Sequence, residues 1–135
     1  AASKAAWEER IAFAKANGMV AMADQTVRRW LRPERVAQPL GERLHAMIAA
    51  TPLDGFVACA TALQNYDEVA VLARVAVPAL LLVGQEDGAM PATMQAMAAA
   101  IPGATIQEIA DAGHLPNYER PDMFNEILLS FLKVS

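Results

Sequence analysis

The sequence predicts an α/β protein in which helices precede two parallel strands, each followed by a helix of its own. The run Val75–Val83 is apolar and uncharged, which is typical of a strand that is buried on both faces of a parallel sheet. Thr105–Ile109 has the length and composition of a second, shorter strand. Before Val75 the apolar residues recur at helical spacing, and no convincing strand pattern is present.

Residues 1–74 are expected to form helices joined by short loops. Asn17-Gly18 should end the first helix, and the second should end before Pro33. A third should end near Thr51-Pro52, a fourth is predicted over Asp54–Asn65 with Asp54 as its N-cap, and a short one over Asp67–Arg74. The apolar faces of the first three helices are Trp7, Ile11, Ala14; Val20, Ala23, Val27, Trp30; and Leu40, Leu44, Met47, Ile48.

From Val75 onward the pattern becomes strand, helix, strand, helix. The first of these helices begins near Pro91 and ends at Pro102-Gly103, and the second has Pro121 in its first turn. Their apolar faces are Met94, Met97, Ala98, Ile101 and Phe124, Ile127, Leu128, Phe131. Two parallel strands are too few for a stable parallel sheet. The sequence is therefore expected to begin part-way through a larger domain and, by itself, to self-associate through surfaces that the rest would cover.

Composition narrows the class of protein. The chain has 135 residues, 55% hydrophobic and 19% charged, with a net charge of −4. These values argue against a disordered chain and against a nucleic-acid partner. No apolar run approaches the roughly 18 residues that span a membrane, and no signal peptide is recognisable. Cys59 is the single cysteine, which suits a reducing compartment. A cytoplasmic protein with no membrane partner is expected.

The two predicted strands carry the candidate catalytic residues directly after them. Asp87 follows the first strand beyond Gly84, and His114 lies in the Gly-containing turn after the second. The carboxyl ends of parallel strands meet at one edge of a sheet, where active-site loops are usually found. Asp87 and His114 are therefore predicted to be the acid and the base of a catalytic triad. Glu86 is the competing carboxylate and is expected to be solvated.

Both segments resemble the α/β-hydrolase superfamily. Val77–Asp87 is similar to its penultimate strand and acid turn, and Ala112–Pro121 to its histidine loop. Within the superfamily, the chain resembles the 3-oxoadipate enol-lactonases, whose lid is similar to Thr51–Phe56 and Cys59-Ala60. The resemblance implies an α/β-hydrolase fold in which residues 1–74 form a helical lid. Residues 75–135 would form the last two parallel strands of the core with their helices.

The resemblance also implies a function, namely hydrolysis of 3-oxoadipate enol-lactone in the bacterial catabolism of aromatic compounds. His114 would take the proton from a serine hydroxyl and later activate water, while Asp87 would orient the imidazole. Neither a metal nor an organic cofactor is implied. Trp30, Met90 and Leu115 are candidates for the substrate pocket, although packing alone also explains Trp30.

The expected nucleophile is the main departure from the family. No G-x-S-x-G sequence occurs, and Ser3, Ser130 and Ser135 have no strand-turn-helix context. The chain would correspond to the lid and the C-terminal half of an enzyme, and alone is expected to be inactive. Cys59 precedes Asp87 and His114 in the order of a cysteine hydrolase. Its helical surroundings favour a buried structural cysteine instead.

Several other charged or titratable residues have ordinary explanations. His45 is expected to be a plain helix residue, and Glu119 to order the loop before the last helix. Arg28, Arg29 and Arg32 either attract an acidic substrate or form a solvated helix face, with the second favoured.

Three alternatives to an enol-lactonase remain open. The first is another hydrolase with a lid, such as an esterase, a haloperoxidase-like enzyme or a dehalogenase. The second is a non-catalytic helical interaction module that keeps the hydrolase motifs only as structure. The third is a split enzyme whose serine lies on a separate chain. For an enol-lactonase or an esterase the expected partner is a small-molecule lactone or ester, and a dehalogenase would instead act on a haloalkane.

Overall fold

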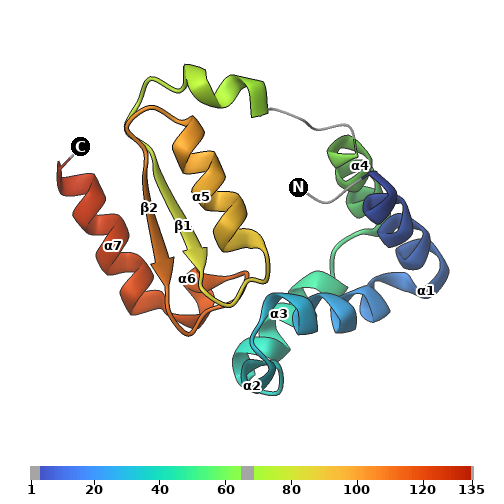
Figure 1. Ribbon diagram of the computed structural model, residues 1–135. Helices are drawn as coiled ribbons and strands as arrows, with labels where there is room; N and C mark the ends of the chain where they lie inside the picture. Colours follow the sequence, from blue (N-terminus) through green and yellow to red (C-terminus); the bar gives the residue numbers. More distant parts are fainter. Residues whose placement is uncertain (1–3, 65–68, 135) are drawn as a thin grey trace. The chain divides into compact units, whose positions relative to one another are not determined.

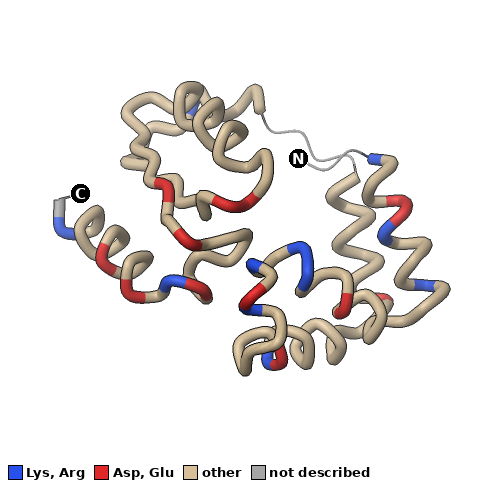
Figure 2. The backbone as a smooth tube through the Cα atoms, turned by 60° about the horizontal axis from the view of Figure 1, so that its bottom comes forward, with Lys and Arg blue, Asp and Glu red and all other residues tan. Residues whose placement is uncertain are grey.

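A computed structural model describes residues 4–64 and 69–134, which fold as two compact units. Of the described residues, the first unit contains 4–29 and 36–64, and the second contains 30–35 and 69–134 (Figure 1). The short segment 30–35 therefore belongs with residues much later in the chain. Lys and Arg as well as Asp and Glu occur in both units (Figure 2). Assigning residues 1–74 to a lid and 75–135 to a core stays a prediction.

The first unit consists of helices that pack around a small apolar core. Its elements are α1 (Lys4–Trp30, whose last residue belongs to the second unit), α3 (Pro39–Ala49) and α4 (Leu53–Leu63). The predicted break at Asn17-Gly18 is confirmed, because α1 is interrupted at Gly18, where φ is 79° and ψ is 172°. A positive φ is readily adopted by glycine alone. The core lies on both sides of this break and contains Ala14, Met19 and Met22, packed against Phe13, Ile48, Leu53 and Phe56.

Two details of the helical prediction are wrong. Asp54 lies in the first turn of α4 rather than at its N-cap, which is Pro52. A further one-turn helix, α2 (Pro33–Val36), follows the predicted stop. Pro33 ends one helix and begins another, because proline has no N–H to donate and its fixed φ suits a first helical turn. Asn65, the predicted end of the fourth helix, and Asp67, the predicted start of the short helix, lie outside the described residues.

No single helix in residues 4–64 and 69–134 is long and apolar enough to cross a membrane. By length and composition, only α3 and α4 taken together pass that test, and they meet at a bend of 91°.

The second unit contains the predicted alternation of strands and helices. Val69–Arg74 forms a 3₁₀ helix; β1 (Leu80–Gly84) and β2 (Thr105–Ile109) pair in parallel, with Leu80 beside Thr105 and Gly84 beside Ile109. Helices α5 (Met90–Ala100) and α7 (Pro121–Val134) lie on opposite faces of this sheet (Figure 1). A short helix, α6 (Pro116–Glu119), was not predicted and lies between β2 and α7.

The first strand is shorter and less buried than its sequence predicts. Pairing begins where the Thr105 N–H donates to the Ala79 carbonyl oxygen, at 2.9 Å. Pro78 has no N–H for a strand ladder, and Val77 before it is 67% exposed. Leu81, Val83 and Gly84 are buried, whereas Leu80 and Leu82 are only half-buried. A groove of about 440 Å³ lies between the sheet and α7. It is lined by Leu80, Thr105, Gln107, Glu126, Ile127, Ser130 and Phe131.

Candidate active site

The loops after the two strands are joined by main-chain hydrogen bonds. The Gln85 N–H donates to the carbonyl oxygen of Ile109, and the Glu86 N–H to that of Ala112, each at 2.9 Å. These bonds continue the parallel pairing beyond Gly84, the last residue of β1. The acid loop and the histidine loop therefore leave the sheet side by side.

Close approach of these loops depends on glycine at two positions. A Cβ on Gly84 would overlap the carbonyl oxygens of Ala112 and Gly113. A Cβ on Gly113 would lie 2.8 Å from the Trp30 carbonyl oxygen and 3.2 Å from Glu119 Oε2. Any larger residue would push the loops apart, so the two glycines hold the site at its observed spacing.

Asp87 and His114 are brought together as the sequence predicts. Asp87 Oδ2 lies 2.8 Å from His114 Nδ1. The Asp87 side chain is 17% exposed and that of His114 is 41% exposed, so the carboxylate is sheltered while the imidazole reaches solvent. A carboxylate can only accept a hydrogen bond, which assigns the proton to Nδ1 and leaves Nε2 as the basic nitrogen. This arrangement can take a proton from a nucleophile and return it.

The Trp30 side chain lies against the imidazole of His114. The two rings are stacked at 5.4 Å between centroids with 29° between their planes. In addition, the main-chain N–H of His114 donates to the main-chain carbonyl oxygen of Trp30 at 2.8 Å. Trp30 thus contacts the candidate base through both its ring and its main chain. Whether it also contacts a substrate stays a prediction.

Met90 and Leu115 are both half-buried and adjoin the two loops. The Met90 N–H donates to the Asp87 carbonyl oxygen at 2.9 Å, which starts α5 directly after the acid. The Leu115 carbonyl oxygen accepts from the N–H groups of Tyr118 and Glu119 and so begins α6. Their contacts with a substrate stay a prediction.

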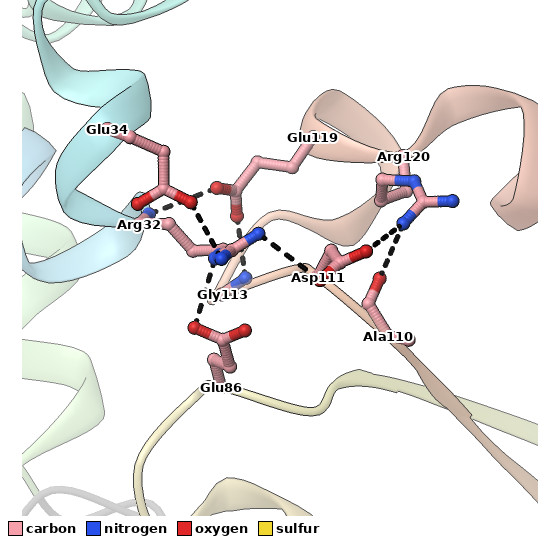
Figure 3. Close-up of polar contacts among 8 residues, drawn as sticks. All are labelled: Arg32, Glu34, Glu86, Ala110, Asp111, Gly113, Glu119 and Arg120. Atoms are coloured by element: carbon pink, nitrogen blue, oxygen red, sulfur yellow. Dashed lines mark hydrogen bonds and ion pairs between the residues drawn. The ribbon is translucent and has the colours of Figure 1, made fainter.

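Arg32 is surrounded by carboxylates (Figure 3). Its guanidinium lies 2.7 Å from Glu34, 3.0 Å from Glu86 and 3.5 Å from Asp111. Its side chain is 21% exposed, so neither a solvated helix face nor a free site for an acidic substrate describes it. Glu86 is likewise ion-paired rather than simply solvated.

Arg28 and Arg29 differ from Arg32 in being exposed. Partial burial and, to a smaller extent, the charge of Arg10 lower the pKa of the Arg29 guanidinium from its ordinary value. The exposure of Arg28 and Arg29 agrees with the solvated helix face that the sequence favours, and Arg32 alone departs from it.

Glu119 is buried, with 4% exposure. Among the described residues, it and Thr26 are the two buried polar residues. One of its oxygens accepts from the Gly113 N–H at 2.6 Å, and the other from the Arg32 N–H at 3.0 Å. Figure 3 shows this carboxylate between the two main-chain segments. The predicted ordering of the loop by Glu119 agrees with the first bond. The second bond has no signal in the sequence, because its partners lie 87 residues apart.

The remaining candidates lie in helices. His45 Nε2 lies 2.9 Å from Asp24 Oδ1, a pairing between α3 and α1 that the sequence does not reveal. Cys59 is exposed, which corrects the expectation of a buried cysteine. Within α4 only Ala60 is buried, and Cys59 precedes it on the neighbouring side of the helix. Ser130 lies inside α7, as predicted. Among residues 4–64 and 69–134, no three His, Cys, Asp or Glu side chains are placed to hold a metal ion.

Comparison with known families and sequences gives a consistent result. A sequence model of the alpha/beta hydrolase family matches residues 2–127. The chain is 27% identical over 131 residues to 3-oxoadipate enol-lactonase 2 of Acinetobacter baylyi, covering 95% of this chain and 49% of that protein. The chain thus spans about half the length of the curated enol-lactonases that it matches.

Solved structures show the same half-length similarity. The enol-lactonase of Burkholderia xenovorans LB400 superposes with a TM-score of 0.91 at 30% identity, covering 98% of this chain and 52% of that one. A thermophilic esterase from Thermogutta terrifontis superposes with a TM-score of 0.86 at 28% identity, covering 96% and 49%.

Proposed function

Because this chain belongs to the alpha/beta hydrolase family, we propose that it supplies the acid and the base of a serine hydrolase that opens enol-lactones. One observation carries the proposal: His114 Nδ1 and Asp87 Oδ2 lie 2.8 Å apart on the loops after two parallel strands. The enol-lactonases among its relatives support an enol-lactone, 3-oxoadipate enol-lactone in particular, as the substrate. That substrate would place the protein in the bacterial catabolism of aromatic compounds.

In this proposal, His114 moves protons while Asp87 fixes its tautomer. Nε2 takes the proton of a serine hydroxyl as the serine oxygen bonds to the lactone carbonyl carbon. The ring C–O bond then breaks, and Nε2 returns the proton to the leaving enol oxygen. The enol, still part of the acyl-enzyme, becomes the ketone by moving a proton to carbon. Finally, Nε2 takes a proton from water as the water oxygen bonds to the acyl carbon. Nε2 then returns this proton to the serine oxygen as the serine–acyl bond breaks, which frees the acid and the serine.

The nucleophile in this mechanism lies outside the 135 residues. They contain no G-x-S-x-G sequence, so we place the serine on another part of the full-length protein or on a separate chain. The 135-residue chain alone is expected to be inactive. Hydrolysis of an activated aryl ester by this chain, measured beside its His114→Ala variant, tests this expectation. Equal background rates support it, whereas activity that the variant loses would contradict it and direct attention to Cys59.

The choice of substrate is tested with the whole enzyme, that is, the protein as its gene encodes it. Turnover of an enol-lactone, an aryl ester and a haloalkane would be compared at equal enzyme concentration. We expect the enol-lactone to be hydrolysed most efficiently, with the rate lost in His114→Ala. Preference for the aryl ester would favour the second candidate, a simple esterase, which the 28% identity to the Thermogutta terrifontis esterase supports. Equal activity of the variant on every substrate would overturn a hydrolase role for His114.

We also propose that the isolated chain self-associates. In the described residues β1 pairs with β2 along one edge only, and Leu129 and Leu132 on α7 are 54% and 59% exposed. Unpaired strand edges and exposed apolar helix faces both favour association. Sedimentation velocity should show species larger than 14.5 kDa, the mass of the chain. A single monomeric species at high concentration would contradict this.

A further inference from the structure

We propose that Glu119 is a positioning residue that fixes His114 by tying the histidine loop to the segment after α1. The proposal rests on the proposed function only in treating His114 as the base. The two hydrogen bonds of the Glu119 carboxylate go to main-chain N–H groups and not to the imidazole or to Asp87. Glu119 therefore acts on His114 through the main chain.

Burial of the Glu119 carboxylate requires compensation. Its residue is 4% exposed, and a buried carboxylate is strongly unfavourable unless both oxygens accept hydrogen bonds. Both do: Oε2 accepts from the Gly113 N–H at 2.6 Å and Oε1 from the Arg32 N–H at 3.0 Å. The compensation therefore comes from two main-chain groups that lie far apart in the sequence. A single side chain holds two distant segments together.

These two segments are the ones that fix the imidazole. Gly113 directly precedes His114, whose N–H donates to the Trp30 carbonyl oxygen at 2.8 Å. Arg32 lies two residues after Trp30, whose ring stacks on the imidazole. Three hydrogen bonds to main-chain N–H groups thus form one short ladder between residues 30–32 and residues 113–114, and Glu119 makes two of them.

The Arg32 side chain strengthens the same link from outside. Its guanidinium lies 3.0 Å from Glu86, next to the acid, and 3.5 Å from Asp111, three residues before the base. Asp111 also pairs with Arg120 at 2.8 Å (Figure 3). Ion pairs with exposed carboxylates such as Glu86 and Asp111 contribute little each. The buried Glu119 carboxylate is therefore the member whose loss should matter most.

Glu119→Gln is the most specific variant for testing the two hydrogen bonds of Glu119, because it keeps the size of the side chain. The amide retains one acceptor oxygen but turns an NH₂ donor toward one of the two N–H groups. One hydrogen bond of the ladder is lost, and two donors face each other. Glu126→Gln on α7 is the matched control, because it removes the same charge from an exposed position of the same unit.

The experiment follows the main chain and the imidazole directly, in the protein as its gene encodes it. After labelling with [¹⁵N]glycine and [¹⁵N]histidine, we expect Glu119→Gln to accelerate hydrogen exchange of the Gly113 and His114 amides by about tenfold or more. The His114 Nδ1–H signal should broaden as the bond to Asp87 loosens. The His45 signals, in the other unit, serve as an internal reference and should not change. Circular dichroism establishes that the variant is folded.

Kinetics separate positioning from general stability. We expect kcat to fall about tenfold in Glu119→Gln, with KM nearly unchanged and Glu126→Gln like the parent. If Glu119→Gln does not fold, Glu119→Asp carries the test, since its shorter carboxylate cannot reach both N–H groups. Unchanged exchange and ring signals at His114 in a folded variant would overturn the proposal. Retained activity in His114→Ala would instead overturn the proposed function, so the two failures are distinguishable.

Discussion

Among the described residues, two His–Asp pairs have nearly equal lengths but very different surroundings. His114 and Asp87 lie 2.8 Å apart in the second unit, and His45 and Asp24 lie 2.9 Å apart in the first. The catalytic candidates use Nδ1 and leave Nε2 as the base, whereas His45 uses Nε2. Distance alone therefore does not distinguish the two pairs.

The surroundings of the two acids differ more than the pairs do. The Asp87 side chain is 17% exposed, while that of Asp24 is 62% exposed. An exposed carboxylate is well hydrated and constrains its partner weakly. His114 is further held by the Trp30 ring and by main-chain bonds. A sheltered acid and a fixed main chain, rather than a short contact, therefore characterise the candidate site.

The largest expected effect is a loss of activity on replacing His114 that does not occur on replacing His45. His114→Ala should lower kcat/KM for ester hydrolysis by about 10⁴-fold or more, because the base is lost. His45→Ala should stay within about twofold of the parent, since a pair on exposed helix surfaces contributes little. Both would be assayed with the preferred ester on the protein as its gene encodes it. Equal losses in the two variants would remove the functional distinction between the pairs.

The two acids should differ in the same sense by a smaller factor. Asp87→Asn keeps the shape of the side chain but favours the wrong tautomer of His114, and should lower kcat by about 10³- to 10⁴-fold. Asp24→Asn provides the matched control and should change kcat less than about twofold. Steady-state kinetics on the same substrate decide the matter. A fully active Asp87→Asn protein would mean that Asp87 is not the orienting acid.

The glycines at the site allow a test through stability. Gly84→Ala should lower the free energy of unfolding by about 3 kcal/mol, because its Cβ would overlap two carbonyl oxygens of the histidine loop. Gly55→Ala in α4 is the control: nothing lies within 4 Å of the added Cβ. It should be neutral or stabilising by up to about 1 kcal/mol. Urea denaturation measures both, and a harmless Gly84→Ala would show that the loops can separate at little cost.

The smallest effect concerns the energy of the His45–Asp24 pair itself. Removing it should lower the free energy of unfolding by less than about 1 kcal/mol, because Asp24 is well exposed to solvent. A double-mutant cycle with His45→Ala and Asp24→Ala, followed by urea denaturation, isolates this coupling. A coupling well above that limit would place the pair among the features that hold the first unit together.

Local patterns were sufficient for much of this protein. The break at Gly18, the two strands and the order of helices in the second unit were all predicted, because glycine, proline and apolar spacing act within a few residues. The same holds for the Asp87–His114 contact. Parallel strands bring their carboxyl ends to one edge, so two residues that follow neighbouring strands must lie close together.

Burial could not be predicted so well. Cys59 is exposed, and two residues of β1 are only half-buried, although both segments have apolar compositions. Composition shows that a residue can be buried, but which face is covered depends on the elements that pack there. The one-turn helices α2 and α6 are also too short to give a periodic signal.

By itself, the sequence determined the α/β class, the two strands and the identity of the candidate acid and base. Only the tertiary structure decided what holds that base in place. The bond between Glu119 and Arg32 joins residues 87 positions apart, and the stacking of Trp30 on His114 spans a similar separation. Such contacts depend on how the chain folds back on itself. No short-range pattern of residues specifies them, since their partners share no element, turn or strand pair.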